Sequence, residues 1–225
     1  MNRRTSNRES VTIPLQLSSI DALILDCDGV LLDTVGAKLR AFQNWVPLEF
    51  ASLRKTFGDY NKTAFGSSRF IQIRYFFEQL AGVPVTEDRV QNEATRFGVL
   101  VARETSNTTW LPGSREFVEQ LYARKIPLYV LSGTPEQELR ENLKQQKGSH
   151  FFQRIIGAPR SKEEGLQSIL EEGAYKPDRT WFIGDANRDY VAARHAGVRF
   201  IYKPSEVIVS EIEPDGVVQD LTELL

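Results

Sequence analysis

Two aspartates, Asp26 and Asp28, stand where an apolar run of strand character, residues 23–25, breaks into a glycine turn. At such a turn one Asp side chain and one Asp backbone carbonyl can face the same crevice and hold a hard cation. Asp26 is then free to act as a nucleophile, and Asp28 can carry a proton to a leaving oxygen. The alternative is an acidic turn after a buried strand, because Asp and Gly are common turn residues.

A second apolar run, residues 126–131, ends in a hydroxyl, a glycine and a second hydroxyl, which are Ser132, Gly133 and Thr134. Pro135 follows as a suitable first residue of a helix. Hydroxyl groups and the free N–H groups at a helix start donate hydrogen bonds to phosphate, and the helix dipole favours its negative charge. This stretch therefore predicts a phosphate-binding seat that includes Ser132 and Gly133.

Carboxylates also follow a third apolar run, residues 181–183, at Asp185 and Asp189. Four carboxylates and a phosphoryl group carry more negative charge than one divalent ion can balance, so a further cation is needed. An intervening loop offers two candidates, Lys162 and Arg160. A single lysine is most often a solvated surface residue, but beside the other strand ends Lys162 becomes the better candidate, with Arg160 as its rival.

The elements that must position these groups follow from the apolar periodicity of the chain. The carboxyl ends of parallel strands form the reactive edge of an open α/β sheet. Amphipathic helices alternate with the strands, and right-handed crossovers then place helices on both faces of the sheet. The sequence predicts a Rossmann-like α/β core with a parallel sheet and with helices at 114–124, 135–146, 162–172 and 187–196.

The interval between the first two strand ends is much longer than one crossover helix requires. Apolar residues spaced three and four apart within it predict amphipathic helices at 38–50, 69–80 and 87–105. We therefore expect a small all-helical cap domain at 35–108, with a hinge of polar residues at each boundary. The catalytic core is expected to comprise residues 1–34 and 111–225.

Ser68 and Arg69, at the start of a predicted cap helix, are the best candidates for reading the substrate. A hydroxyl and a guanidinium at this place can bind a polyol or an anion. The alternative is an ordinary helix N-cap, with Ser67 or Ser68 as the capping residue and Arg69 solvated.

The composition predicts a soluble cytoplasmic protein, with 26% charged residues, 41% hydrophobic residues and a net charge of −2. This balance points to no nucleic-acid or membrane partner, and we expect a monomer or a homodimer. The Arg3–Arg4 pair could suggest a twin-arginine export signal, but no apolar segment follows it, so we expect a frayed tail.

Cys27 is the only cysteine, which excludes an intramolecular disulfide, and its acidic neighbours argue against a thiol nucleophile.

Four segments occur in a fixed order: DCDGVLLDT, LSGT, the lysine at position 162, and IGDANRD. Together they anchor nearly all of residues 21–202. This ordered set resembles the haloacid dehalogenase superfamily of phosphohydrolases, within the subfamily of phosphoglycolate phosphatases and β-phosphoglucomutases that carry a helical cap of the first type.

The resemblance implies a role for each matching residue. Asp26 is the nucleophile that becomes an aspartyl phosphate, and Asp28 is the general acid and base. The residues implied to bind the transferring phosphoryl group are Ser132, Gly133 and Lys162.

The resemblance also implies that Mg²⁺ is held by Asp26, the Asp28 carbonyl and Asp185, with Asp189 as an additional acidic residue of the metal site. The implied activity is hydrolysis of a small phosphorylated metabolite, such as a sugar or polyol phosphate. The alternatives are a phosphomutase of the same superfamily and a non-catalytic member that binds a phosphorylated ligand. Lys38 stands where the β-phosphoglucomutases usually have a histidine, which argues against the mutase.

Overall fold

A six-stranded sheet lies at the centre of the computed structural model, which describes residues 19–225. The strand order is β3-β2-β1-β4-β5-β6, and every neighbouring pair is parallel, which confirms the predicted sheet. The Arg3–Arg4 pair lies outside the described residues. The strands are β1 Ala22–Leu25, β2 Leu128–Pro135, β3 Arg154–Ala158, β4 Thr180–Gly184, β5 Arg199–Tyr202 and β6 Gly216–Val217.

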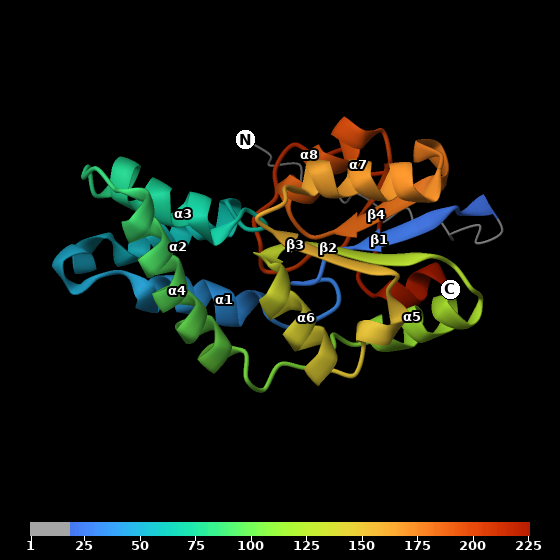
Figure 1. Ribbon diagram of the computed structural model, residues 1–225, viewed down its shortest axis with the longest axis horizontal. Helices are drawn as coiled ribbons and strands as arrows, with labels where there is room; N and C mark the ends of the chain where they lie inside the picture. Colours follow the sequence, from blue (N-terminus) through green and yellow to red (C-terminus); the bar gives the residue numbers. More distant parts are fainter. Residues whose placement is uncertain (1–18) are drawn as a thin grey trace, which may run out of the picture.

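Helices cover both faces of the sheet, as predicted (Figure 1). The core helices are α5 Ser114–Ala123, α6 Glu136–Gln145, α7 Lys162–Gly173 and α8 Asn187–Ala196. Leu23 and Leu25 of β1 share an apolar cluster with α5 and α6, whereas Ala22 and Ile24 share one with α7 and α8. This alternation is the period of two expected for a strand buried on both faces, and it gives the residues after β1 a rigid support.

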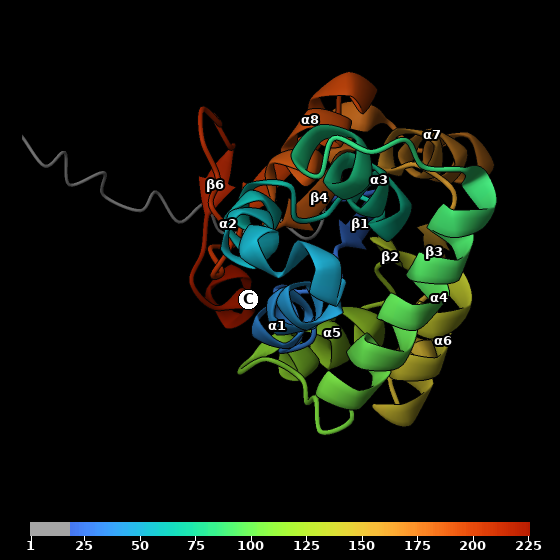
Figure 2. The same cartoon turned by 90° about the vertical axis from the view of Figure 1, so that its left-hand side faces the viewer.

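The segment between β1 and α5 is helical and has an apolar core of its own, lined by aromatic rings. Figure 2 faces this segment and shows its helices in front of the sheet. The ring of Phe76 lies 5.1 Å from that of Trp45 and 4.9 Å from that of Phe57, centroid to centroid. None of the residues in this cluster belongs to the two clusters that flank the sheet. The helices are α1 Val35–Trp45, α2 Arg54–Thr63, α3 Arg69–Tyr75 and α4 Glu87–Glu104.

We refer to α1 to α4 as the cap helices; the domain boundaries at 35–108 stay a prediction. The helix predicted over 38–50 ends early, at Trp45, because Pro47 disfavours helical geometry in the residue before it. The helix α2 was missed because its buried face consists of Phe57, Gly58 and Asn61, which gives little apolar periodicity.

Smaller departures concern element ends. Pro135 is the last residue of β2 and precedes α6 rather than beginning it. The helix predicted over 69–80 consists of α3 followed by one π-helical turn. The short helical turns are η2 Leu48–Leu53, η3 Phe76–Leu80, η4 Ser149–Phe151, η5 Pro177–Arg179 and η6 Leu221–Leu224.

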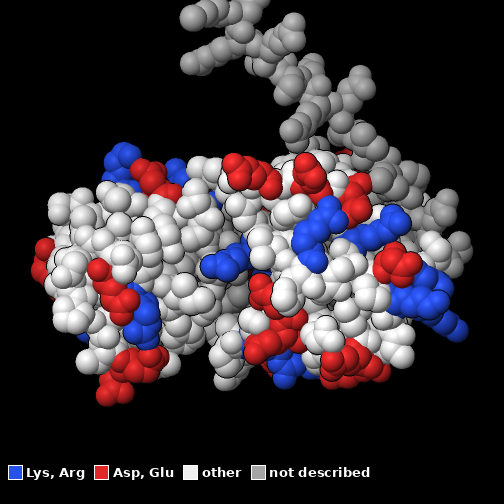
Figure 3. Space-filling view, turned by 90° about the horizontal axis from the view of Figure 1, so that it is seen from above, with Lys and Arg blue, Asp and Glu red and all other residues white. Residues whose placement is uncertain are grey.

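On the molecular face shown in Figure 3, acidic and basic side chains are interspersed over the core rather than gathered by sign. None of the helices formed by residues 19–225 is both long enough and apolar enough to span a bilayer.

Candidate active site

The residues that end β1 and β4 meet at the centre of the sheet. Leu25 pairs with Ile183, and the Asp26 N–H donates to the Ile183 carbonyl oxygen at 2.9 Å. Successive strands are added on one side of β1 and then on the other, so this pair lies at the point where the strand order reverses, which is where open α/β sheets bind ligands. Asp26 and Asp185 are thereby placed side by side at the carboxyl edge.

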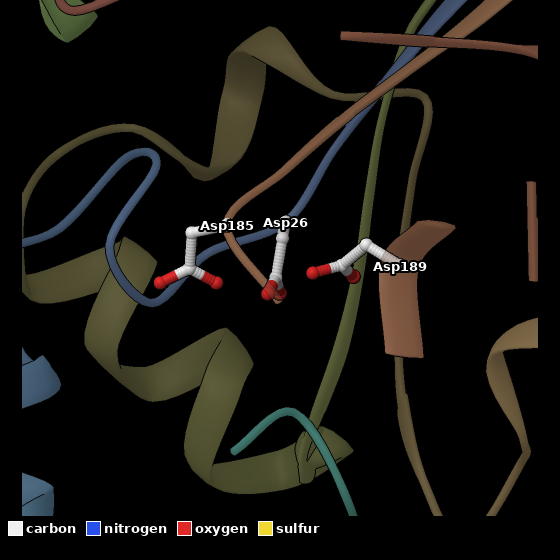
Figure 4. Close-up of side chains that lie close together, drawn as sticks. All are labelled: Asp26, Asp185 and Asp189. Carbon is white, nitrogen blue, oxygen red and sulfur yellow. The ribbon is translucent and has the colours of Figure 1, made fainter. Parts of the chain in front are cut away.

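Three buried carboxylates gather at this edge. Figure 4 shows Asp26 between Asp185 and Asp189, with the carboxylate of Asp189 turned toward Asp26. One oxygen from each of the three lies within 4.8 Å of the others. Lys162 Nζ lies 3.1 Å from Asp26 Oδ2 and also forms an ion pair with Asp189. Lys162 therefore holds two of the three carboxylates together.

Burial dominates the electrostatics of this cluster. It raises the pKa of Asp26 to about 7; Lys162 opposes this shift, and the charges of Asp189 and Asp28 add to it. Burial, together with Asp26 and Asp189, also raises the pKa of Asp185 well above its usual range. Burial alone would lower the pKa of Lys162, but the charges of Asp189 and Asp26 outweigh it and raise that pKa. The site thus has more buried negative charge than one lysine balances.

The donor set fits a hard divalent cation. Asp185 Oδ1 is buried and has no hydrogen-bond partner in the described chain, while Oδ2 accepts from the Ser205 hydroxyl at 2.6 Å. Gly29 has φ +75°, and a Cβ there would lie 2.1 Å from Asp185 Oδ2, so only glycine lets the carboxylate approach this closely. An unpartnered carboxylate oxygen among other carboxylates is what Mg²⁺, which prefers oxygen ligands, requires.

The Asp28 side chain is not one of the three clustered carboxylates and contacts a second lysine instead. Lys38 Nζ, from α1, lies 2.7 Å from Asp28 Oδ2 and 2.6 Å from Thr134 Oγ1. Thr134 also donates to Asp28 Oδ2 at 3.0 Å, and Thr34 donates to Oδ1. Burial raises the pKa of Asp28, but Lys38 and the hydrogen bonds from Lys38, Thr34 and Thr134 outweigh it, so the net pKa is lowered. The ion pair with Lys38 was not anticipated from the sequence.

The predicted phosphate-binding residues lie beside these carboxylates. Ser132 is buried with its hydroxyl 3.5 Å from Asp28 Oδ2. Ser132 and Gly133 line one cavity with Asp26 and Asp28, which we call the catalytic cavity; its volume is about 40 Å³. The cap contributes most of its remaining wall, through Lys38, Phe42, Phe65, Gly66, Ser67, Arg69, Gln72 and Phe97.

The two predicted substrate-reading residues are placed differently. Arg69 is buried, lines the catalytic cavity and pairs with Glu138 Oε2 of α6 at 2.6 Å. Ser68 is the N-cap of α3, where its hydroxyl accepts from the Phe70 N–H, and it lines a neighbouring cavity instead. For Ser68 the geometry is therefore that of the capping alternative.

Burial decides against two other candidates, Arg160 as the cation and Cys27 as a nucleophile. Arg160 is exposed and lines the neighbouring cavity, so the cation in contact with Asp26 is Lys162. Burial and the charge of Asp28 raise the pKa of the Cys27 thiol well above its usual range, which keeps it protonated and unsuited to act as a nucleophile.

Lys203 was missed entirely. It is buried, and its Nζ donates to the Gly29 carbonyl at 3.1 Å. Burial lowers its pKa, with Asp185 among the opposing charges. The sequence could have indicated Lys203, because it directly follows the apolar run of β5, just as Asp26 and Asp185 follow the runs of β1 and β4.

Comparisons with known proteins agree with this arrangement. Residues 23–203 match the family described as haloacid dehalogenase-like hydrolase. A phosphoglycolate phosphatase of Pseudomonas putida is 29% identical over 128 residues, which cover 52% of this chain and 47% of that protein. Phosphoglycolate phosphatase 1 of Pseudomonas aeruginosa is 22% identical over 219 residues, covering 90% of this chain and 78% of that one. The match to the Pseudomonas putida protein spans about half the length of that protein.

Solved structures show the same fold. CbbY from Rhodobacter sphaeroides, in complex with xylulose-(1,5)-bisphosphate, superposes with a TM-score of 0.75 at 19% identity, over 91% of this chain and 96% of that one. The match to the family model extends from β1, before Asp26, to Lys203, beyond Asp185 and Asp189, and so contains the whole carboxylate cluster. The chain therefore belongs to the haloacid dehalogenase-like hydrolase family.

Proposed function

We propose that the chain is a magnesium-dependent phosphatase that hydrolyses a small phosphorylated metabolite, such as a sugar or polyol phosphate, through an aspartyl phosphate. The single observation that carries this proposal is the pairing of Asp26 with Lys162 in one buried cluster, while Asp28 faces the same cavity. The phosphoglycolate phosphatases among the relatives support a phosphoric monoester as substrate.

The first step is attack by a carboxylate oxygen of Asp26 on phosphorus. The bond between phosphorus and the ester oxygen breaks, and Asp28, once protonated, gives its proton to that departing oxygen. Lys162, which pairs with Asp26, and the hydroxyl of Ser132, which lines the catalytic cavity, would bind the phosphoryl oxygens as charge builds on them.

In the second step, water attacks phosphorus and the bond to Asp26 breaks. Asp28 accepts the water proton, and phosphate leaves. The ion pair with Lys38 favours the ionised form of Asp28, which is the form this step needs. Asp26, Asp185 and the Asp28 carbonyl would hold Mg²⁺, with Asp189 as an additional acidic residue beside them; the ion when bound would supply charge neutralisation to the phosphoryl group.

Phosphate release from a panel of sugar, polyol and carboxylate phosphates tests the proposal, with phosphoglycolate included because of the relatives' names. Each substrate is assayed with Mg²⁺ and with a chelator, for the wild type and for Asp26→Asn. We expect release that needs Mg²⁺ and that is lost in Asp26→Asn. Asp33→Asn is the matched control, because it makes the same chemical change at an exposed carboxylate outside the catalytic cavity.

The outcomes separate the candidate activities. Release that persists in Asp26→Asn would refute the nucleophile assignment. Isomerisation of a sugar phosphate without release of phosphate would indicate a phosphomutase. A folded wild type that is silent on every substrate, with or without Mg²⁺, would indicate a non-catalytic binding protein.

A further inference from the structure

Gln72, on α3, lines the catalytic cavity with a carboxamide whose orientation is fixed. The side chain is 3% exposed, and its Nε2 donates to the Ser67 carbonyl oxygen at 2.9 Å. A carbonyl oxygen can only accept, so the amide nitrogen must face Ser67 and the amide oxygen must face the other way. The position of Gln72 Oε1 is therefore not open to an exchange of the two amide ends.

Gln72 Oε1 is buried and has no hydrogen-bond partner among residues 19–225. The two charged cap side chains in the same cavity already have partners: Lys38 bonds to Asp28 and Thr134, and Arg69 bonds to Glu138. Buried acceptors are rarely left unpaired in folded proteins, and those that are left so concentrate at functional sites. The cap thus contributes to the wall of this cavity one residue, Gln72, whose buried amide oxygen has no partner in the described chain.

An unpaired amide oxygen is not a binding site by itself, because a second residue of the cap has one and does not line the catalytic cavity. Asn61 on α2 is 0% exposed, its Nδ2 donates to the Phe57 carbonyl at 2.8 Å, and its Oδ1 also has no partner in the described chain. Asn61 does not line the catalytic cavity, whereas Gln72 does. The position of Gln72 in the wall that faces Asp26 and Asp28 distinguishes the two.

We infer that Gln72 is a specificity-determining residue that selects phosphate monoesters carrying a hydroxyl group on a short carbon chain. A substrate hydroxyl is a donor that the amide oxygen lacks, and a carboxylate at the same place would oppose it with a second acceptor. Phe42 and Phe97, which also line the cavity, offer no acceptor or donor in competition. The catalytic cavity is small, about 40 Å³, so the test uses three-carbon esters.

The inference rests on the proposed phosphatase function and predicts a definite kinetic preference. A site that hydrogen-bonds a substrate hydroxyl rejects the analogue without it, because the protein acceptor is then left unpaired. The wild type is expected to favour glycerol 1-phosphate over propyl phosphate by at least about 10-fold in kcat/KM. The two propanediol monophosphates show which of the two hydroxyls is read.

The test compares this preference in three proteins. Gln72→Met keeps the length of the side chain and removes the acceptor, so we expect the preference to fall to near unity. Asn61→Leu is the matched control, since it also removes a buried amide that bonds to a backbone carbonyl, and it should keep the preference of the wild type. A preference that survives in Gln72→Met, or one that is lost equally in Asn61→Leu, would overturn the assignment.

Acetyl phosphate separates failure of this inference from failure of the proposed function, because its hydrolysis needs the core residues but offers no hydroxyl. If the wild type hydrolyses acetyl phosphate and uses glycerol 1-phosphate and propyl phosphate equally well, the hydroxyl reading is wrong and the phosphatase stands. If the wild type hydrolyses none of the three but releases phosphate from another ester of the panel, the hydroxyl reading is wrong and the phosphatase stands. If it releases phosphate from no ester at all, both proposals are wrong. The comparison within the wild type decides the question even if Gln72→Met does not fold.

Discussion

At the scale of single residues, the site is a balance of buried charges. Of the three clustered carboxylates, Asp26 and Asp189 pair with one lysine and Asp185 pairs with no lysine of the described chain, whereas Asp28 bonds to Lys38 and to two threonine hydroxyls. The pKa of Asp28 is lowered as a result, while the pKa values of Asp26 and Asp185 are raised by burial. Two carboxylates of one site are thus driven toward different protonation states, the arrangement that divides acid and base roles in enzymes.

The raised pKa of Asp26 predicts how metal binding depends on pH. The pKa is about 7 in the folded protein, above the usual value of 3.8, so the folded state holds its proton more tightly than the unfolded state does. Without metal, this group makes its largest contribution to stability below the unfolded pKa and loses that contribution as pH rises toward 7. The proposed Mg²⁺ site needs ionised carboxylates, so the increase in Tm on adding Mg²⁺ should be larger at about pH 8 than at about pH 5.5.

Thermal unfolding with Mg²⁺ and with a chelator at both pH values checks this expectation. Asp26→Asn removes the titrating group and should weaken the pH dependence. An increase in Tm of the same size at both pH values would contradict the raised pKa.

At the scale of elements, the seam between the cap helices and the core shapes the catalytic cavity. A Cβ at Gly133, in the end of β2 that is predicted to bind phosphate, would lie 2.6 Å from the Gly66 carbonyl oxygen of the cap. Arg69 pairs with Glu138 across the same seam. The backbone of the cap therefore approaches the phosphate seat as closely as a glycine permits.

Gly133→Ala is expected to keep the cap from seating on the core. Overpacking by a methyl group costs about 1–3 kcal/mol, so kcat/KM should fall by about 10-fold or more while the separate core remains folded. Small-angle X-ray scattering should show a larger radius of gyration than in the wild type. Gly36→Ala is the control, because a Cβ there meets only the ends of two flexible side chains, at 3.3 Å and beyond. An unchanged radius of gyration in Gly133→Ala would mean that the cap still seats on the core and that the seam accommodates the added methyl group.

At the scale of the whole molecule, two apolar cores support one active site. The clusters that flank the sheet carry Asp26, Asp28 and Asp185, and the aromatic cluster of the cap carries Lys38 and Gln72 on its helices. No residue is shared between the cap cluster and the sheet clusters. The cap can therefore lose its packing without removing the support of the catalytic aspartates.

Phe76→Ala tests this separation, because the ring contacts Trp45 and Phe57 inside the cap cluster. Truncation of a buried Phe lowers the free energy of unfolding by about 3–5 kcal/mol, and we expect the cap to be the part that is destabilised. Hydrogen exchange is expected to accelerate in α1 to α4 and to stay slow in β1 and β4. Phe182→Ala, in the cluster between the sheet and α8, should instead accelerate exchange throughout. Uniform acceleration in both variants would show that the two cores unfold as one.

The order of local patterns along the chain was enough to predict the family, the parallel sheet with helices on both faces, and the strand ends that carry Asp26 and Asp185. Each of these features depends on residues close in sequence, namely an apolar run followed by a polar turn. The helix α2 was not predicted, because one of its buried residues is Gly58, which has no apolar side chain. A Cβ at Gly58 would lie 2.5 Å from Gln43 Nε2, and this close packing cannot be recognised from local periodicity. The catalytic and phosphate-binding roles stay predictions until they are tested.

Only the tertiary structure decided which charges face one another. Lys162 meets Asp26 across 136 positions of sequence, and Lys38 meets Thr134 across 96. The tertiary structure also decides that Gln72, whose amide bonds to the Ser67 carbonyl, lines a cavity between the cap and the core. Local composition sets which groups stand at the ends of strands and helices, but the pairing of buried charges depends on how those elements pack, because desolvation and Coulomb attraction act through space and not along the chain.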